Sequence, residues 1–289
     1  MSGLKTLRTR IKSVKNTRQI TKTMKMVAAA KVRRARTAVE AARPYAQKLS
    51  EVLANLSGGS AGGPLLMTGR KQVKAVRLIV IGTDRGLCGG LNSNLLKAAY
   101  VAINQQQSAG RTVQLVAVGR KIRDAFKSTH KNLLVASHTD MGRMVEVEHA
   151  QTIAAEALAA FEAGEVDEVH VLYSAMQSML TQTPTQQQII PFSSEAEQDS
   201  EPLLRATPEY EPGEEEVLAK LLPLNLNMQV FSAMLDTQAS EHAARMSAMD
   251  SATRNAGEMI KRLSLQYNRS RQAAITKELI EIISGAEAL

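Results

Sequence analysis

Apolar residues near the N-terminus recur in steps of mostly three and four. No Pro and no Gly interrupts residues 4–43, and forty helical residues span about 60 Å at 1.5 Å each. Pro44 is a place where the helix could kink or restart before the Gly-rich run at 58–63 ends it. The pattern predicts one long helix over residues 1–57, with a stripe at Leu4, Leu7, Ile11, Val14, Ile20, Met24, Val27, Val32, Ala35, Val39 and Ala42.

The C-terminal part carries a second long pattern. No proline follows Pro223, and steps of four and three alternate for five heptads, which is the 3.5-residue repeat of a coiled coil. We expect a helix over 216–289, about 100 Å long, that pairs antiparallel with the N-terminal helix because neither can bury its stripe alone. Its predicted seam is Leu235, Ala239, His242, Met246, Met249, Thr253, Ala256, Ile260, Leu263, Tyr267, Ser270 and Ala274.

Between the two helices, residues 73–192 alternate short apolar runs with amphipathic segments. Strands are predicted at 76–81, 113–118, 133–136 and 168–173, helices at 91–107, 120–127 and 145–163, and an antiparallel edge strand near 180–191. This order is typical of a Rossmann-like, mostly parallel sheet. The predicted fold class is therefore α/β plus a long antiparallel coiled coil, with an acidic connecting segment at 193–215.

Charge is distributed unevenly along the chain. Residues 1–48 contain fourteen Lys and Arg against the single acid Glu40, although the whole chain carries a net charge of only +8. Such a basic helix needs an acidic partner, which could be nucleic acid, anionic lipid or an acidic protein surface. No aromatic residue precedes Tyr45, so base stacking has no support, but a basic coiled-coil nucleic-acid-binding protein remains the alternative function.

Few residues offer chemistry of their own. The Gly-rich turn after the first strand contains neither GxGxxG nor GxxxxGK[ST], the histidines are scattered, and Cys88 is the single cysteine. We therefore predict no disulfide, no cofactor, no metal site and no catalytic residue, and an α/β enzyme with helical arms stays a minor alternative. No run of about 18 apolar residues is present, so no membrane-spanning helix is predicted, and residues 1–30 lack the features of a secretory signal.

Four segments resemble the gamma subunit family of F-type ATP synthases. They are RIKSVKNTRQITKTMKMVAAAK at 10–31, DRGLCGGLN at 84–92, ASEHAARMSAMD at 239–250 and QYNRSRQAAITKELIEIISG at 266–285. The resemblance implies a non-catalytic rotor, whose coiled coil penetrates a hexamer of alpha and beta subunits while the globular part stands on the c ring beside the epsilon subunit. Proton-driven rotation of the c ring would then be coupled to ATP synthesis or hydrolysis in that hexamer.

The resemblance also implies particular contacts. Met24 and Lys25 match positions near acidic lever loops of the beta subunits. Catch loops of the hexamer are expected to touch Arg245, Arg271, Gln272, Thr276 and Glu278, and Glu211 matches a segment on the c-ring and epsilon side. The cysteine-bearing insertion of chloroplast relatives is missing, which favours a peripheral protein on the cytoplasmic face of a bacterial inner membrane.

Overall fold

The computed structural model describes residues 2–57, 64–140, 144–192 and 214–287. The chain separates into two compact units, one formed by Met1–Ala30 with Arg245–Leu289 and the other by Lys31–Ala244. Both divisions fall inside a long helix, α1 (Ser2–Ser57) or α6 (Glu214–Glu287). The units therefore cut across the segments 1–57 and 216–289, and most of the expected acidic segment 193–215 lies outside the described residues.

The two long helices confirm the lengths that the sequence predicts. α1 continues through Pro44 without interruption, and α6 begins before Pro223 and includes it. Each strand and helix expected between residues 73 and 192 is also present, with bounds that differ by a few residues.

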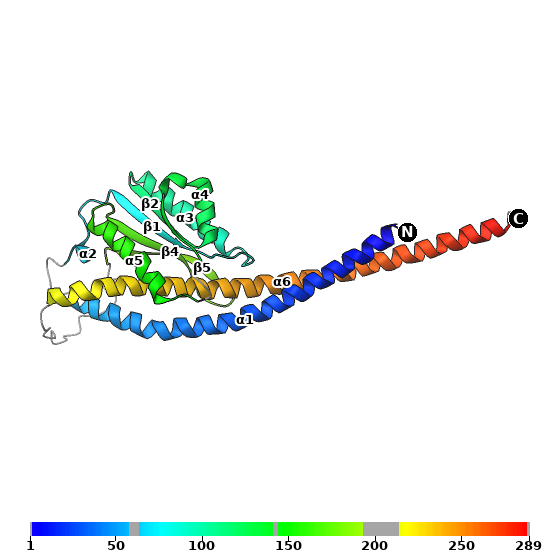
Figure 1. Cartoon of the computed structure of the whole chain (residues 1–289), viewed down its shortest axis with the longest axis horizontal. Coiled ribbons are helices and arrows are strands. Elements are labelled where there is room, and N and C mark those ends of the chain that lie inside the picture. Colours follow the sequence, from blue (N-terminus) through cyan, green and yellow to red (C-terminus); the bar gives the residue numbers. More distant parts are fainter. Residues whose placement is uncertain (1, 58–63, 141–143, 193–213, 288–289) are drawn as a thin grey trace. The chain divides into compact units, whose positions relative to one another are not determined.

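The Lys31–Ala244 unit contains a five-stranded sheet of order β3-β2-β1-β4-β5 (Figure 1). The strands are β1 (Ala75–Ile81), β2 (Thr112–Val118), β3 (Leu134–His138), β4 (Glu168–Met176) and β5 (Gln182–Ile190). The helices between them are α2 (Leu65–Thr68), α3 (Leu91–Ser108), α4 (Arg120–Thr129) and α5 (Val147–Glu162), with a 3₁₀ turn at Lys131–Leu133. Every neighbouring pair is parallel except β4 and β5, so the predicted antiparallel edge strand is confirmed.

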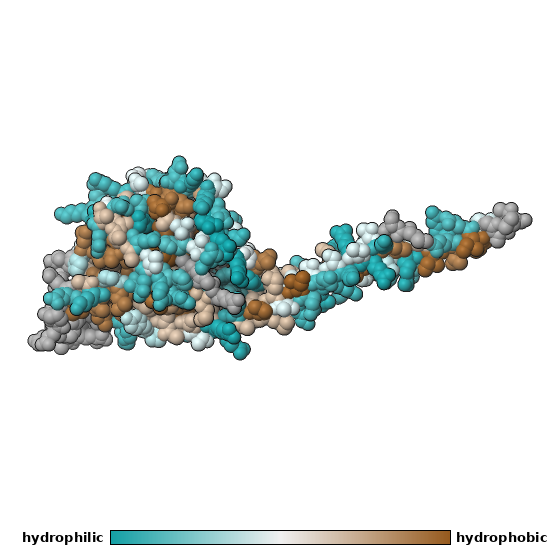
Figure 2. Space-filling model, viewed as in Figure 1, coloured by the Kyte–Doolittle hydropathy of each residue, from teal (hydrophilic) through white to brown (hydrophobic). Residues whose placement is uncertain are grey.

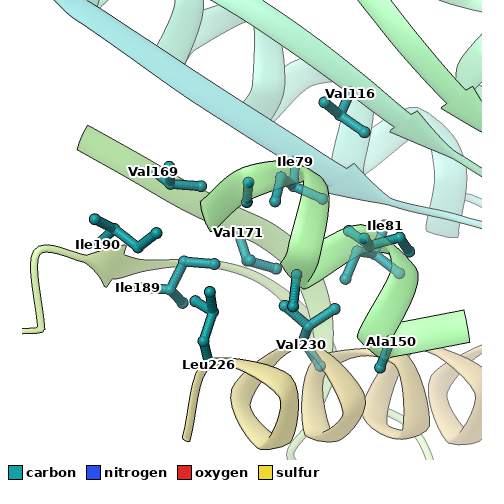
Figure 3. Packing of buried hydrophobic residues seen from close by; sticks show 14 of the residues in the cluster. Ile79, Ile81, Val116, Ala150, Val169, Val171, Ile189, Ile190, Leu226 and Val230 are labelled. Carbon is teal, nitrogen blue, oxygen red and sulfur yellow. The ribbon is translucent and has the colours of Figure 1, made fainter. Parts of the chain in front are cut away.

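Alternate residues of β1 face two separate hydrophobic cores, as the two-residue period of a strand requires. Val76, Leu78 and Val80 pack with α3 and α4 on one face. On the other face, Ile79 and Ile81 pack with α5 and with α6 through Leu226 and Val230 (Figure 3). The first part of α6 is thus a layer of the α/β domain, which explains why β1 is buried along nearly its whole length.

Within this unit α1 also lies antiparallel to α6. Leu49 and Leu53 of α1 form a small core with Leu218 and Leu222 of α6. This contact joins the end of α1 to the beginning of α6.

Candidate functional site

The coiled coil of the other unit contains most of the residues expected to carry function. Here the first part of α1 meets the last part of α6, and polar pairs define their register. The Thr253 hydroxyl lies 2.8 Å from the Thr21 hydroxyl, and Lys25 Nζ lies 2.6 Å from Asp250 Oδ1. The residue numbers of these pairs add to 274 or 275, which confirms an antiparallel pairing and places Leu4 opposite the region of Ser270.

The predicted seam of α6 is confirmed in this unit. Met249, Ala256 and Leu263 are buried, and the intervening seam residues are partly buried. Small side chains such as Ala28 and Ala256 let the helices approach closely, and polar residues such as Thr253 interrupt the apolar layers.

The predicted stripe of α1 is wrong at two positions. Ile20 and Val27 are 59% and 53% exposed, whereas Thr21 and Ala28 occupy the seam. A strict sequence of three- and four-residue steps from Val14 leads to positions 21 and 28, so helical geometry outweighs the hydrophobicity of the neighbouring residues. The apolar side chains at positions 20 and 27 are left on the surface.

Lys25 has an intramolecular partner that sequence reasoning missed. Its hydrogen bond, helped by its charge and that of Arg254, holds the pKa of Asp250 below the usual range, although burial opposes the shift. The position of Asp250 next to the seam residue Met249 could have indicated that it meets a residue of α1. Only the register of the two helices identifies that residue as Lys25. Met24 lies beside this pair and is partly buried.

The other expected contact residues are spread along α6. Arg245 is partly buried near one end of the unit, whereas Arg271, Gln272, Thr276 and Glu278 are exposed near the other. Arg245 and Glu278 are 33 residues apart, or about 50 Å along a helix. The predicted residues are therefore distributed along the coiled coil and do not form one pocket, and Glu211 lies outside the described residues.

Beyond Ala274, α6 has no α1 residue left to pair with in the observed register. Its exposed face there includes a group of large aliphatic side chains, Ile275, Leu279, Ile280, Ile282 and Ile283, all about half exposed or more. Figure 2 shows the corresponding hydrophobic patches toward the C-terminal end of the helix. Such a face on a single helix indicates an interaction surface.

The Gly-rich turn of the α/β domain is used for packing. A Cβ on Gly82 would lie 2.3 Å from Ile122 Cγ1, so the glycine allows the close approach of the β1 loop to α4. Asp84 Oδ1 accepts the Arg120 backbone N–H at 2.9 Å, and the Thr83 hydroxyl donates to the Arg85 carbonyl at 2.7 Å. The polar groups of this turn are thus engaged with the protein itself.

The place where an open α/β sheet usually binds its ligand is occupied by α6. In such sheets the crevice lies beyond the carboxyl ends of the strands, at the point where strand order reverses, here between β1 and β4. The Thr237 hydroxyl contacts the Ile81 carbonyl at 3.4 Å, and the Ser240 hydroxyl donates to the Ser174 carbonyl at 2.8 Å. Ala244 packs with Cys88 and Leu91, so helix side chains fill this crevice.

Among the described residues, no helix combines the length and the apolarity needed to cross a membrane.

The paired long helices and the α/β domain on them define a class of coiled-coil protein whose candidate contact residues are distributed along the helices. Residues 3–289 match the family model described as ATP synthase. Gamma chains of ATP synthase from Fuscovulum blasticum, Ruegeria pomeroyi and Phenylobacterium zucineum are 52%, 51% and 49% identical to this chain, over the full length of both proteins in each case.

Solved structures agree with these relatives. A chain of the central stalk and c ring of the Tetrahymena thermophila mitochondrial ATP synthase aligns with a TM-score of 0.61 at 25% identity, covering 81% of this chain and 99% of that one. A chain of the Euglena gracilis mitochondrial ATP synthase has the same fold, with a TM-score of 0.68 at 19% identity over 99% of this chain and 94% of that one. The chain belongs to the family of ATP synthase gamma chains, the non-catalytic rotor subunits of that enzyme.

Proposed function

We propose that this chain is the central rotor stalk of an F-type ATP synthase. In this role it couples proton-driven rotation of the c ring to ATP synthesis or hydrolysis in a hexamer of alpha and beta subunits. Family membership over the whole length and the antiparallel coiled coil support the proposal. The active sites then belong to the hexamer, and this chain contributes torque and asymmetric surfaces.

The observation that carries the proposal is the unbalanced positive charge of the coiled coil. Seven Lys and Arg side chains between Lys5 and Lys22 form no ion pair with any residue in the described part of the chain. The facing segment of α6, residues 245–287, has seven basic residues and five acidic ones, so it cannot neutralise them. Acidic surfaces on surrounding subunits would supply the missing charge.

The exposed end of α6 supports the same role. Its aliphatic face from Ile275 to Ile283 has no partner helix in the observed register, and a ring of apolar loops around a rotating helix would cover it. Within this proposal Arg271, Gln272, Thr276 and Glu278 meet catch loops of the hexamer at the tip, and Arg245 meets them farther along. Met24 and Lys25 meet acidic lever loops of the beta subunits.

The proposal extends to further partners and to location. The globular unit would stand on the c ring, next to the epsilon subunit, with Glu211 on that side. Full-length similarity to bacterial gamma chains supports a peripheral position at the cytoplasmic face of the bacterial inner membrane.

Reconstitution with alpha and beta subunits tests the proposal directly. A bead attached to the globular unit should rotate in steps when ATP is added, whereas the isolated chain should hydrolyse no ATP. Lys25→Glu should weaken rotation more than Lys97→Glu, a control with the same charge change on α3. Absence of rotation in a hexamer that contains the chain would refute the role.

The same preparation separates the alternatives. Tight nucleic-acid binding with a steep salt dependence, together with failure to assemble with alpha and beta subunits, would identify a basic coiled-coil nucleic-acid-binding protein instead. ATP hydrolysis by the isolated chain would identify an enzyme.

A further inference from the structure

A cavity of about 520 Å³ lies inside the Lys31–Ala244 unit, between α1, the first part of α6 and the β4–β5 hairpin. Its volume is within the range that accommodates small organic molecules. Val39, Met228 and Leu235 contribute apolar walls, and Gln187 donates a hydrogen bond to Gln229 across one side at 3.2 Å.

Three polar side chains that line this cavity have no hydrogen-bond partner among the described residues. Asn225 is only 2% exposed and lines the cavity, yet its side chain forms no hydrogen bond with any residue that the structure describes. The Asp236 carboxylate and the Tyr173 hydroxyl, both partly buried, also lack hydrogen bonds within the described residues. The amide of Asn225 is not among the fully enclosed polar atoms without a partner, so its atoms keep a small accessible surface, where water or a ligand can meet their hydrogen-bonding needs.

Asp236 is the charged group of the cavity lining that is partly buried. Burial raises the pKa of its carboxyl group above the ordinary value, and Arg43 opposes the shift without cancelling it. Arg43 is exposed to solvent and forms no ion pair with a described residue, whereas Asp236 is partly buried. The other titratable groups in the lining are Glu51, which pairs with Lys48, and Tyr173, whose pKa is raised by burial and by Asp236.

We propose that this cavity is a binding site for a small organic amine with an apolar body, held by its ammonium group between Asp236 and Asn225. An ionised carboxylate only accepts hydrogen bonds, and the amide oxygen of Asn225 can accept another, so an ammonium group satisfies both. The apolar body packs against Val39, Met228 and Leu235, and the face of Tyr173 favours a nearby cation. The carboxylate would repel an anion, and a neutral molecule would leave the exposed Arg43 as the compensating charge for Asp236 in the lining.

The test compares three probes that share a six-carbon chain: hexylammonium, hexanol and hexanoate. Their binding to the full chain is measured at pH 7 by ligand-observed NMR titration. Hexylammonium should bind about tenfold more tightly than hexanol, because a charged hydrogen bond to a partly buried group is worth roughly that factor. Hexanoate should bind most weakly of the three.

Three variants of the chain complete the test, with circular dichroism confirming that each is folded. Asp236→Asn should reduce the affinity for hexylammonium to that for hexanol, while the matched surface control Asp124→Asn should leave it unchanged. Arg43→Ala should raise the affinity for hexylammonium about twofold, because a repelling cation near the opening is removed.

Some outcomes would overturn the proposal. Equal binding of the three probes would show that the cavity does not select an ammonium group. No binding of hexylammonium at about 10 mM would show that the cavity does not bind this amine with the affinity usual for small fragments. Weaker binding of hexylammonium to Arg43→Ala would show that the arginine helps to hold the ligand, and the assignment of a simple cation would be wrong.

Discussion

Gly257 lies in the middle of α6, inside the coiled coil, where a glycine has no evident structural necessity. A Cβ at this position would meet its nearest neighbour, Arg18 Nε, at 3.7 Å, which is ordinary van der Waals contact. Gly257→Ala should therefore stabilise the coiled coil by about 0.8–1 kcal/mol, since alanine loses less backbone entropy in a helix.

Gly82→Ala is the matched control, because the same methyl group there has no space. Its Cβ would lie 2.3 Å from Ile122 Cγ1 and 2.8 Å from Cδ1, and Ile122 is fully buried and cannot move aside freely. Overpacking of this kind costs about 1–3 kcal/mol, so the two substitutions should have opposite signs.

Urea unfolding followed by far-UV circular dichroism measures both effects. With a slope of about 2–3 kcal/mol per M, Gly257→Ala should raise the midpoint of the coiled-coil transition by about 0.3–0.5 M, and Gly82→Ala should lower that of the α/β unit. A lower midpoint for Gly257→Ala would refute the reasoning, since neither propensity nor space opposes alanine there. An unchanged midpoint for Gly82→Ala would show that the α4 contact is not close-packed.

Three further predictions concern charged and polar pairs. Lys25→Glu places a like charge opposite Asp250 and should strongly impair ATP-driven rotation while lowering the urea midpoint only slightly. Adding Asp250→Lys should restore the urea midpoint but not rotation. Unchanged proton-driven ATP synthesis in Lys25→Glu would count against the contact with the beta subunits. Thr253→Val should change the unfolding free energy by at most about 0.5 kcal/mol, because Thr21 keeps its hydrogen bond to the Arg18 carbonyl; a loss above about 1.5 kcal/mol would show that the hydroxyl pair is essential. Asp236→Asn should stabilise the chain at pH 7 and not near pH 3. Burial raises the folded-state pKa of Asp236, so ionisation of this group lowers the free energy of unfolding of the wild type as pH rises through that pKa. Equal urea midpoints of wild type and variant at pH 7 would contradict this prediction.

The sequence by itself determined the elements and their order. A 3.5-residue repeat, the absence of breakers and alternating apolar runs are local properties of the chain, and they were sufficient for both long helices, for the five strands and for the antiparallel edge strand β5. The four family-like segments were sufficient for the rotor family. These features need no knowledge of which distant residues touch.

Only the tertiary structure decided the register and everything that depends on it. Thr21 and Ala28 lie in the seam in place of Ile20 and Val27 because the register optimises many contacts between α1 and α6 together. The positions of apolar residues along α1 alone do not contain this information. The pairing of Lys25 with Asp250 joins residues 225 positions apart. The cavity at Asp236 likewise exists only where α1, α6 and the β4–β5 hairpin meet, because its walls come from segments that have no relation along the sequence.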